Sequence, residues 1–281
     1  MKQRNLAGPL GIIFFLIYMF LPIVATYAFS VATRWDRTIL PEALTTAWYK
    51  TAFQDPWFLI VFGHSILIST ATVAVSTILV VPTAYWAHLR LRGALPLLNL
   101  ISTLPFAVPA VVLALGLIKL YGQGGAQLAR TPVMLALAYV IFTLPFMYRP
   151  VASSLEANDI RTLTEASQSL GASWPRTIVQ VIMPNIMPGI LSGGLLVFAT
   201  IFGEFTLATL LVGARFKTFP MQLVYYTRRD GRIASAYSVI SFTVAWAASL
   251  VILWIATWGT RRSAGRERGV AEQQVAAGGK L

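Results

Sequence analysis

The residues that could do chemistry in this chain are few and widely spaced. Among 281 residues there are ten Asp and Glu, two His and no Cys, which excludes disulfides, thiolate metal sites and a cysteine nucleophile. His64 and His88 have no carboxylate beside them in the sequence, which favours packing or interfacial roles. Nothing matches the spacing of an enzyme active site or a metal site. We therefore predict that the chain is not an enzyme and binds no metal.

Phosphate and nucleic acid are also poor matches. The glycine-rich stretch Gly122-Gln-Gly124-Gly125 lacks the lysine that a phosphate-binding loop needs. The net charge is +12, but the 22 Lys and Arg are scattered in short stretches and form no long basic run or basic-aromatic stripe. We predict no nucleic-acid partner and no cofactor bound by this chain.

Glu204 is the one acid deep in a hydrophobic segment, FGEFTLATLLVG. A carboxylate at the membrane centre costs about 2.5–3.5 kcal/mol by insertion scales, so it should face a cavity or a partner group. Counting from Pro184 places it roughly 30 Å along a helix. Two interpretations stay open. Glu204 and Phe205 form part of a gate or translocation path, or the carboxylate is hydrogen-bonded to a neighbouring helix.

The elements that position these residues are predicted to be membrane helices. Hydrophobic residues make up 57% of the chain and charged residues 11%, against about 25% charged in soluble domains. Six segments approach or exceed the length of about 20 residues that a span needs: Asn5 to Thr33, Pro56 to Leu89, Gly93 to Ile118, Thr131 to Tyr148, Asn185 to Ala214 and Ile233 to Thr260. We predict an all-α integral membrane protein with one six-span domain over residues 1–260 and a flexible cytoplasmic tail over residues 261–281.

The distribution of basic residues orients these spans weakly. With cytoplasmic termini, twelve Lys and Arg lie on the cytoplasmic side and ten on the other side. The chain ends and the turn at residues 90–92 favour termini inside, whereas the basic loop Arg215 to Arg232 argues against it. That loop could meet an acidic binding protein, attract an anionic solute or hold lipid phosphates.

Prolines interrupt the third predicted span, LPFAVPAVVLALG. Pro105 and Pro109 each remove a helical hydrogen bond, so a kink or break is expected there. Such a break either shapes a translocation path or is merely accommodated by packing.

A polar segment of residues 149–184 separates the fourth and fifth spans. Thr162 and Glu165 have the spacing of a capping box, which predicts a helix that starts near Leu163. Gly171 is placed to end that helix in a left-handed conformation. Ser173 is placed to cap a second helix with Pro175 in its first turn, and Pro184 is expected to end it.

The first of these helices has a narrow apolar stripe. Leu163, Ala166 and Leu170 follow the i, i+3, i+7 spacing of one helix face. An amphipathic helix on the membrane surface would favour Lys and Arg on its polar face, and Leu163 to Gly171 has none. The pattern favours docking in a groove on another protein, with surface association as the alternative.

The same segment resembles a family signature. Glu165-Ala166-Ser167, then Gly171, then Val181-Ile182-Met183-Pro184 match the pattern E-A-A-x3-G-x9-I-x-L-P, with Ser167, Val181 and Met183 as conservative departures. This signature is typical of the permease subunits of binding-protein-dependent ABC importers. The resemblance extends from the first span through Thr260 and is closest to the polyamine, organophosphonate, iron and sulfate group.

The resemblance implies a type I importer in a bacterial inner membrane, with both termini cytoplasmic. The helix from Leu163 to Leu170 would be a coupling helix inserted into a partner ATPase, with Gly171 as its bend and Glu165 capping locally or facing a basic group there. ATP and Mg would be bound by the partner. The implied partners are two ATPase subunits, a second permease, an extracytoplasmic solute-binding protein and membrane lipid.

The implied function is ATP-driven import of a small solute by alternating access, with organophosphonate or polyamine as the leading substrates. Pro105, Pro109, Glu204 and Phe205 would then lie on the path or gate. The competing interpretation is an ion-coupled secondary transporter, which predicts intramembrane ionisable groups such as Glu204.

Overall fold

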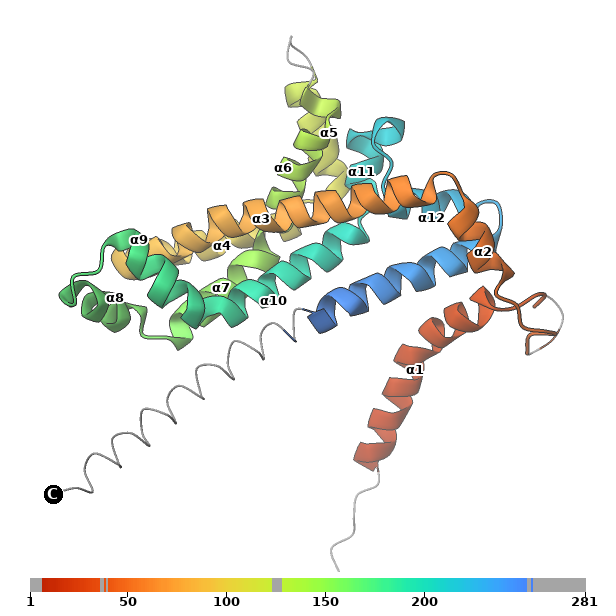
Figure 1. The fold of residues 1–281 in the computed structure, drawn as a ribbon, viewed down its shortest axis with the longest axis horizontal. Coiled ribbons are helices and arrows are strands. Elements are labelled where there is room, and N and C mark those ends of the chain that lie inside the picture. The colour runs from red at the N-terminus through yellow and green to blue at the C-terminus, as the bar shows by residue number, and fades with distance from the viewer. Residues whose placement is uncertain (1–6, 36–37, 39, 123–127, 252–253, 255–281) are drawn as a thin grey trace, which may run out of the picture. The chain divides into compact units, whose positions relative to one another are not determined.

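The computed structural model describes residues 7–35, 38, 40–122, 128–251 and 254 (Figure 1). Within these ranges the chain is helical, and its extended pairing is confined to one bridge between Ala32 and Leu44. The α-helices are α1 (Ala7–Ser30), α2 (Ala47–Gln54), α3 (Phe58–Arg90), α4 (Leu95–Ala107), α5 (Ala110–Tyr121), α6 (Pro132–Phe142), α7 (Leu144–Ala157), α8 (Ile160–Ser169), α9 (Trp174–Thr177), α10 (Met183–Phe202), α11 (Thr206–Leu211) and α12 (Phe219–Thr227). Short turns of other helical types are η1 (Arg92–Ala94), η2 (Leu128–Arg130), η3 (Ile178–Ile182) and η4 (Gly213–Arg215). The all-α prediction is confirmed.

Four helices are long and apolar enough to cross a membrane: Leu10–Ser30, Phe58–Arg90, Trp174–Phe202 and Gly231–Val251. Two bent pairs bring the number to six if each pair is one span. All six correspond to predicted segments. The predicted end of the last span at Thr260, the tail over residues 261–281, and Gly124 and Gly125 of the glycine-rich stretch lie outside the described residues.

Proline chemistry explains both bent pairs. α4 and α5 meet at 98°, because the chain extends at Val108 and Pro109 before α5 begins. This break is where Pro105 and Pro109 predict it. The second bend, 48° between α6 and α7, was not predicted. It falls at Thr143, and Pro145 in the first turn of α7 cannot continue the α6 hydrogen-bond ladder.

The fifth span differs from its prediction at both ends. Residues Trp174–Phe202 form one continuous helix, so Pro184 does not end a helix. Inside this helix, directly before Met183 and Pro184, lies a π-helical turn, η3. In this turn the Met183 N–H donates to the Ile178 carbonyl five residues earlier. This wider turn lets the chain pass through a proline that offers no N–H. The span then ends at Phe202, and not at Ala214 as predicted.

The described residues form two compact units, the first within residues 7–64 and 217–244 and the second within residues 65–216 and 245–254. The first unit has an aromatic core around Phe58. The Phe58 ring makes edge contacts with Phe219 and Tyr237 at centroid distances of 5.9 and 5.7 Å. This core joins the start of α3 to α12 and to the last span.

In the second unit, α7 and α10 lie side by side (Figure 1). Glycines permit the close approach. A Cβ on Gly189 would lie 2.5 Å from Cβ of Ser154, and one on Gly193 would lie 2.8 Å from Sδ of Met147. α7 leads into α8, and α9 leads into α10 through η3. The polar segment between them is therefore mounted on a tightly packed helix pair.

Candidate functional site

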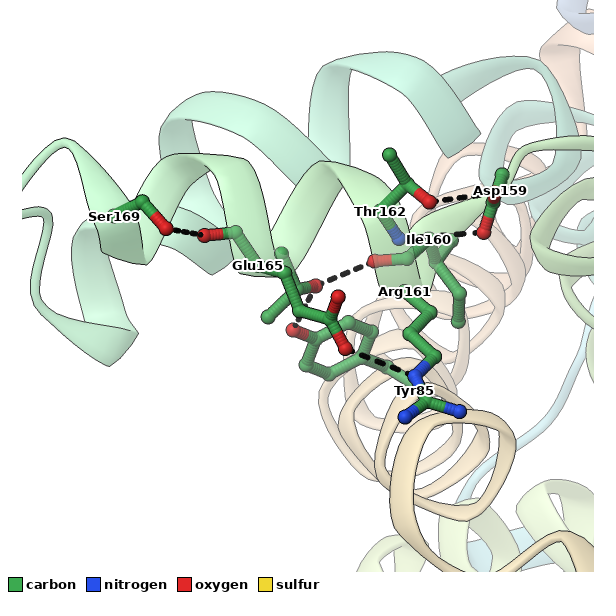
Figure 2. Close-up of polar contacts among 8 residues, drawn as sticks. Tyr85, Asp159, Ile160, Arg161, Thr162, Glu165 and Ser169 are labelled. Carbon is green, nitrogen blue, oxygen red and sulfur yellow. Dashed lines mark hydrogen bonds and ion pairs between the residues drawn. The ribbon is translucent and has the colours of Figure 1, made fainter.

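The helix of the polar segment, α8, begins earlier than predicted. Asp159 is its N-cap, and the Asp159 carboxylate accepts from the N–H and the hydroxyl of Thr162 at 3.3 and 2.7 Å (Figure 2). The predicted capping box of Thr162 and Glu165 is therefore wrong. An aspartate N-cap accepts from an N–H of the first turn in the same way as the predicted cap, but one turn earlier in the chain. The hydrogen bonds from Thr162, with help from the charge of Arg92, hold the pKa of Asp159 below its ordinary value.

Glu165 pairs with a residue of its own helix, so the predicted local cap is wrong, whereas the predicted contact with a basic group on the ATPase stays a prediction. Its carboxylate lies 2.9 Å from Nε of Arg161, one turn back on the same helix (Figure 2). Both side chains are more than half exposed, so this pair adds little to stability. This contact raises the pKa of Arg161 above its ordinary value. Glu165 thus neither caps α8 nor is buried, and it lies on the outer surface of the segment.

The opposite face of α8 anchors the helix to the end of α3. Thr164 donates to the Ile160 carbonyl at 2.6 Å, so the Tyr85 hydroxyl, 2.9 Å away, donates to Thr164 (Figure 2). Ser167 is hydrogen-bonded to Thr177 of α9 at 3.0 Å. Thr164 and Ser167 are buried. Their hydroxyls therefore fix the orientation of α8 through satisfied buried hydrogen bonds.

The turn after α8 is a Schellman motif. Gly171 has φ of 81°, as predicted from its position. The Gly171 N–H donates to the Gln168 carbonyl and the Ala172 N–H donates to the Ser167 carbonyl, at 2.9 and 3.1 Å. Ser173 occupies the N-cap position of α9 with Pro175 in the first turn, as predicted, but its side chain makes no capping hydrogen bond. The chain reverses here within a few residues.

The exposed part of α8 and this turn form a groove of about 450 Å³. It is lined by Leu163, Ala166, Ser167, Leu170, Gly171, Ala172, Arg176 and Val181. Leu170 at its rim is 89% exposed. Five of the six residues predicted for a partner interface line this groove, and the sixth, Glu165, lies on the exposed surface of the same helix. The structure thus brings the predicted set together.

Glu204 follows the break after α10 and lies before the short α11. Its carboxylate accepts from the N–H groups of Thr206, Leu207 and Ala208 at 2.7 to 3.3 Å. The hydroxyl of the fully buried Tyr139 also donates to it at 3.1 Å. Glu204 therefore does not lie within a continuous helix, as the predicted fifth span required, and the predicted bond to a neighbouring helix is confirmed. The role of Glu204 and Phe205 in a gate stays a prediction. Phe205 is half-buried beside it.

The comparisons with known proteins identify the family. The sequence model of the family "Binding-protein-dependent transport system inner membrane component" matches residues 90–264, more than half of the chain. The chain belongs to this family. It is the permease subunit of a binding-protein-dependent ABC importer, and a multi-pass inner membrane protein.

Individual relatives are similar over most of their length. The spermidine/putrescine transport system permease protein PotB of Escherichia coli (strain K12) is 27% identical over 86% of this chain and 93% of its own. The putative 2-aminoethylphosphonate transport system permease protein PhnV of Salmonella typhi is 26% identical over 87% and 91%. A crystal structure of a bacterial ABC transporter involved in the import of the acidic polysaccharide alginate has a TM-score of 0.68, at 18% identity over 90% and 97%.

Family membership decides between the two transport interpretations. An importer permease is energised through its binding-protein-dependent ABC system, so the alternative of an ion-coupled secondary transporter is set aside. The acid that supported that alternative, Glu204, is held by the start of α11 and by Tyr139. The relatives are transport permeases, which agrees with the prediction that the chain is not an enzyme.

The first unit of the permease holds a carboxylate that no sequence pattern singled out. Asp55, between α2 and α3, accepts from Gln222, Tyr226 and Tyr237 at 2.6 to 3.0 Å and from the Trp57 N–H at 2.9 Å. Partial burial would raise the pKa of Asp55, but these four hydrogen bonds outweigh it and lower the pKa below its ordinary value. Asp55 thus ties α12 and the last span to the start of α3.

The basic loop of the permease is largely engaged with its own chain. Lys217 lies 4.1 Å from the ring centre of Trp57, and Arg229 lies 4.2 Å from that of Tyr225. Arg232 lies over Trp48 at 4.4 Å and donates to the Thr33 carbonyl at 3.0 Å. Three of the five basic residues therefore stabilise the first unit through cation–π contacts.

The two histidines also differ in their surroundings. His64 Nδ1 lies 2.9 Å from the Lys217 carbonyl oxygen, in line with a packing role. His88 is buried, in line with a packing role, and its Nε2 also lies 3.6 Å from Glu156. The carboxylate comes from α7, 68 positions away in the sequence, which local spacing cannot indicate. Across the described residues no three His, Cys, Asp and Glu side chains form a metal-binding group.

Proposed function

We propose that this permease moves a small solute inward by alternating access and that α8 with the Gly171 turn is the element that docks a separate ATPase subunit. ATP and Mg²⁺ are bound by that subunit. The second permease and an extracytoplasmic solute-binding protein complete the importer. The observation that carries the proposal is the groove beside α8, where five of the six predicted interface residues meet around the exposed Leu170.

The mounting of α8 supports a role in transmitting motion. Its buried hydroxyls bind it to α3 and α9, and its two flanking helices run into the packed pair α7 and α10. A displacement of the docked helix would therefore be passed to the fifth span. Leu170 is a large apolar side chain left in solvent, which is the expected anchor of a helix-in-groove interface.

The test is co-purification of the ATPase subunit with the permease carrying Leu170→Asp. A carboxylate buried in an apolar contact is strongly unfavourable, so ATPase recovery and ATP-driven uptake should both fall at least tenfold. Leu40→Asp is the matched control, because Leu40 is also an exposed leucine outside the membrane-spanning helices. Normal ATPase recovery with Leu170→Asp would refute the docking role.

For the substrate, we propose an organophosphonate or a polyamine. Similarity to PotB and PhnV supports both to a similar degree. Glu204 accepts four N–H and O–H groups of its own chain, so it is poorly placed to select a cation. Selection would then rest mainly on the binding protein. The complete importer should show ATP-driven uptake of either spermidine or 2-aminoethylphosphonate. Uptake of neither compound would reject both substrates.

A further inference from the structure

A second groove, of about 550 Å³, lies where α3 ends and α4 begins. Its lining is almost entirely apolar and includes Pro82, Trp86, Leu91, Leu97, Ile101 and Ile178, with no acidic residue. A smaller cavity of about 220 Å³ shares Thr83, Leu98 and Ile101 with it and extends to Leu79 and Leu144. The two together form one apolar track along α3 and α4, which we call the corner groove.

The corner groove has the length of one membrane leaflet. From Leu91 to Leu79 the track follows α3 for twelve residues, which is roughly 18 Å at the helical rise. The hydrocarbon core of a bilayer is about 30 Å thick, so one leaflet is about 15 Å. An extended acyl chain fits a track of this length and composition.

The end of the corner groove near Leu91 has a basic and aromatic rim. Trp86 and Trp174 lie 5.7 Å apart, and Arg90 lies 5.9 Å from the Trp174 ring centre. Arg90 and Arg92 are both exposed. Tryptophan and arginine side chains gather at the headgroup level of membranes. Arg92 is also near Asp159, so Arg90 is the better placed of the two to bind an anionic headgroup.

We propose that the corner groove binds an anionic phospholipid, with an acyl chain on the apolar track and the phosphate on Arg90 and Arg92. The acyl chain of any lipid fits the track, so the proposal is specific in its preference for a negatively charged headgroup. The end of α3 also carries Tyr85, which holds α8. A bound lipid would therefore stabilise the same helix end that positions α8.

The first test is native mass spectrometry of the complete importer, purified from bilayers that contain equal amounts of phosphatidylglycerol and phosphatidylcholine. A basic residue at the membrane surface contributes about 1 kcal/mol, which is about a fivefold preference. The ratio of retained phosphatidylglycerol to phosphatidylcholine should fall about fivefold in Arg90→Gln. It should fall further in the double variant with Arg92→Gln.

Arg149→Gln is the matched control, because Arg149 is also exposed and lies 5.8 Å from an aromatic ring, but that ring is Phe106 and not one of the two tryptophans at the rim of the groove. Its ratio should equal that of the wild type. An unchanged ratio in Arg90→Gln, or an equal fall in Arg149→Gln, would overturn the proposal.

The second test locates the lipid by tryptophan quenching. Phosphatidylglycerol with brominated acyl chains should quench a component of the fluorescence that is missing in Trp86→Phe, and brominated phosphatidylcholine should quench it less. Equal quenching by both lipids would indicate ordinary, non-selective lipid and overturn the proposal. No quenching of this component in the complete importer would show that lipid does not reach the groove, which also overturns the proposal.

Discussion

At the scale of single residues, several polar side chains inside this permease form hydrogen bonds with residues from distant positions. Tyr85 reaches Thr164, Tyr139 reaches Glu204, and Asp55 gathers donors from α12 and the last span. A buried polar group without a partner is costly in a protein that offers little water. These pairs therefore fix which helix ends meet.

The Tyr85 hydroxyl should contribute measurably to the stability of the α8 mounting. Tyr85→Phe removes the donor to the buried Thr164 and should lower the free energy of unfolding by about 0.5–1.5 kcal/mol. Thr164→Val should have a similar effect. In the double variant the two losses should not add, because they break the same bond. Full additivity in thermal unfolding of the purified permease would show that the bond contributes nothing.

Tyr226 should titrate well above an ordinary tyrosine. Burial, and then its bond to Asp55, raise the pKa of Tyr226 from 10.0 to about 12. Between these values the unfolded chain loses the phenol proton while the folded chain keeps it. The stability this provides is therefore present below pH 10 and lost as pH rises through 12.

Ultraviolet difference titration of wild type against Tyr226→Phe checks this value. With Asp55→Asn the pKa should fall part of the way toward 10.0, because burial remains as the largest cause. A tyrosine that titrates near its ordinary value in the wild type would contradict the hydrogen-bonded cluster around Asp55.

At the scale of elements, local signals predicted which helices exist better than where they end. Gly171 and Ser173 were placed correctly, because a left-handed glycine and an N-cap residue act through the nearest few residues. The predicted start of α8 was wrong, because Asp159 and Thr162 are both good N-cap residues and burial of Ile160 favours the earlier start. Pro184 was misread, because a π-helical turn is not visible in a sequence pattern.

The turn at Gly171 should depend on backbone conformation alone. A Cβ at Gly171 would meet nothing within 4 Å, but its φ is +81°. Gly171→Ala should therefore cost about 1–2 kcal/mol from the left-handed conformation, and Gly171→Asn should cost less. Gly116→Ala is the control, because Gly116 has equal space within α5. Equal thermal stabilities of the Gly171→Ala and Gly116→Ala variants would contradict the Schellman turn.

At the scale of the whole molecule, hydropathy and proline positions predicted the set of membrane segments. They could not predict the side chains that donate to Glu204 and Asp55, which come from residues 65 to 182 positions away. The break at Gly203 was missed because FGEFTLATLLVG is as apolar as the helix before it. The helix–turn–helix of the polar segment was largely predictable because its signature is local in sequence. The prediction of one domain over residues 1–260 stays a prediction.

The orientation of the permease also stays a prediction, and the chain is well suited to test it. It has no cysteine, so single cysteines can be introduced without removing native ones. Ser169→Cys in α8 should react with an impermeant maleimide only from the cytoplasmic side. Leu40→Cys should react only from the outside. Labelling of both positions from one side would show that the assigned six-span topology is wrong.

The proposed mechanism depends on contact between the ATPase subunit and α8 with its Gly171 turn. The most direct measurement is photocrosslinking in the assembled importer, with a maleimide-linked crosslinker on Leu170→Cys and on the control Leu40→Cys. Leu170 is 89% exposed at the groove rim, so we expect a crosslink to the ATPase subunit from Leu170→Cys and none from Leu40→Cys. A transport-competent importer in which Leu170→Cys gives no ATPase crosslink would contradict the account.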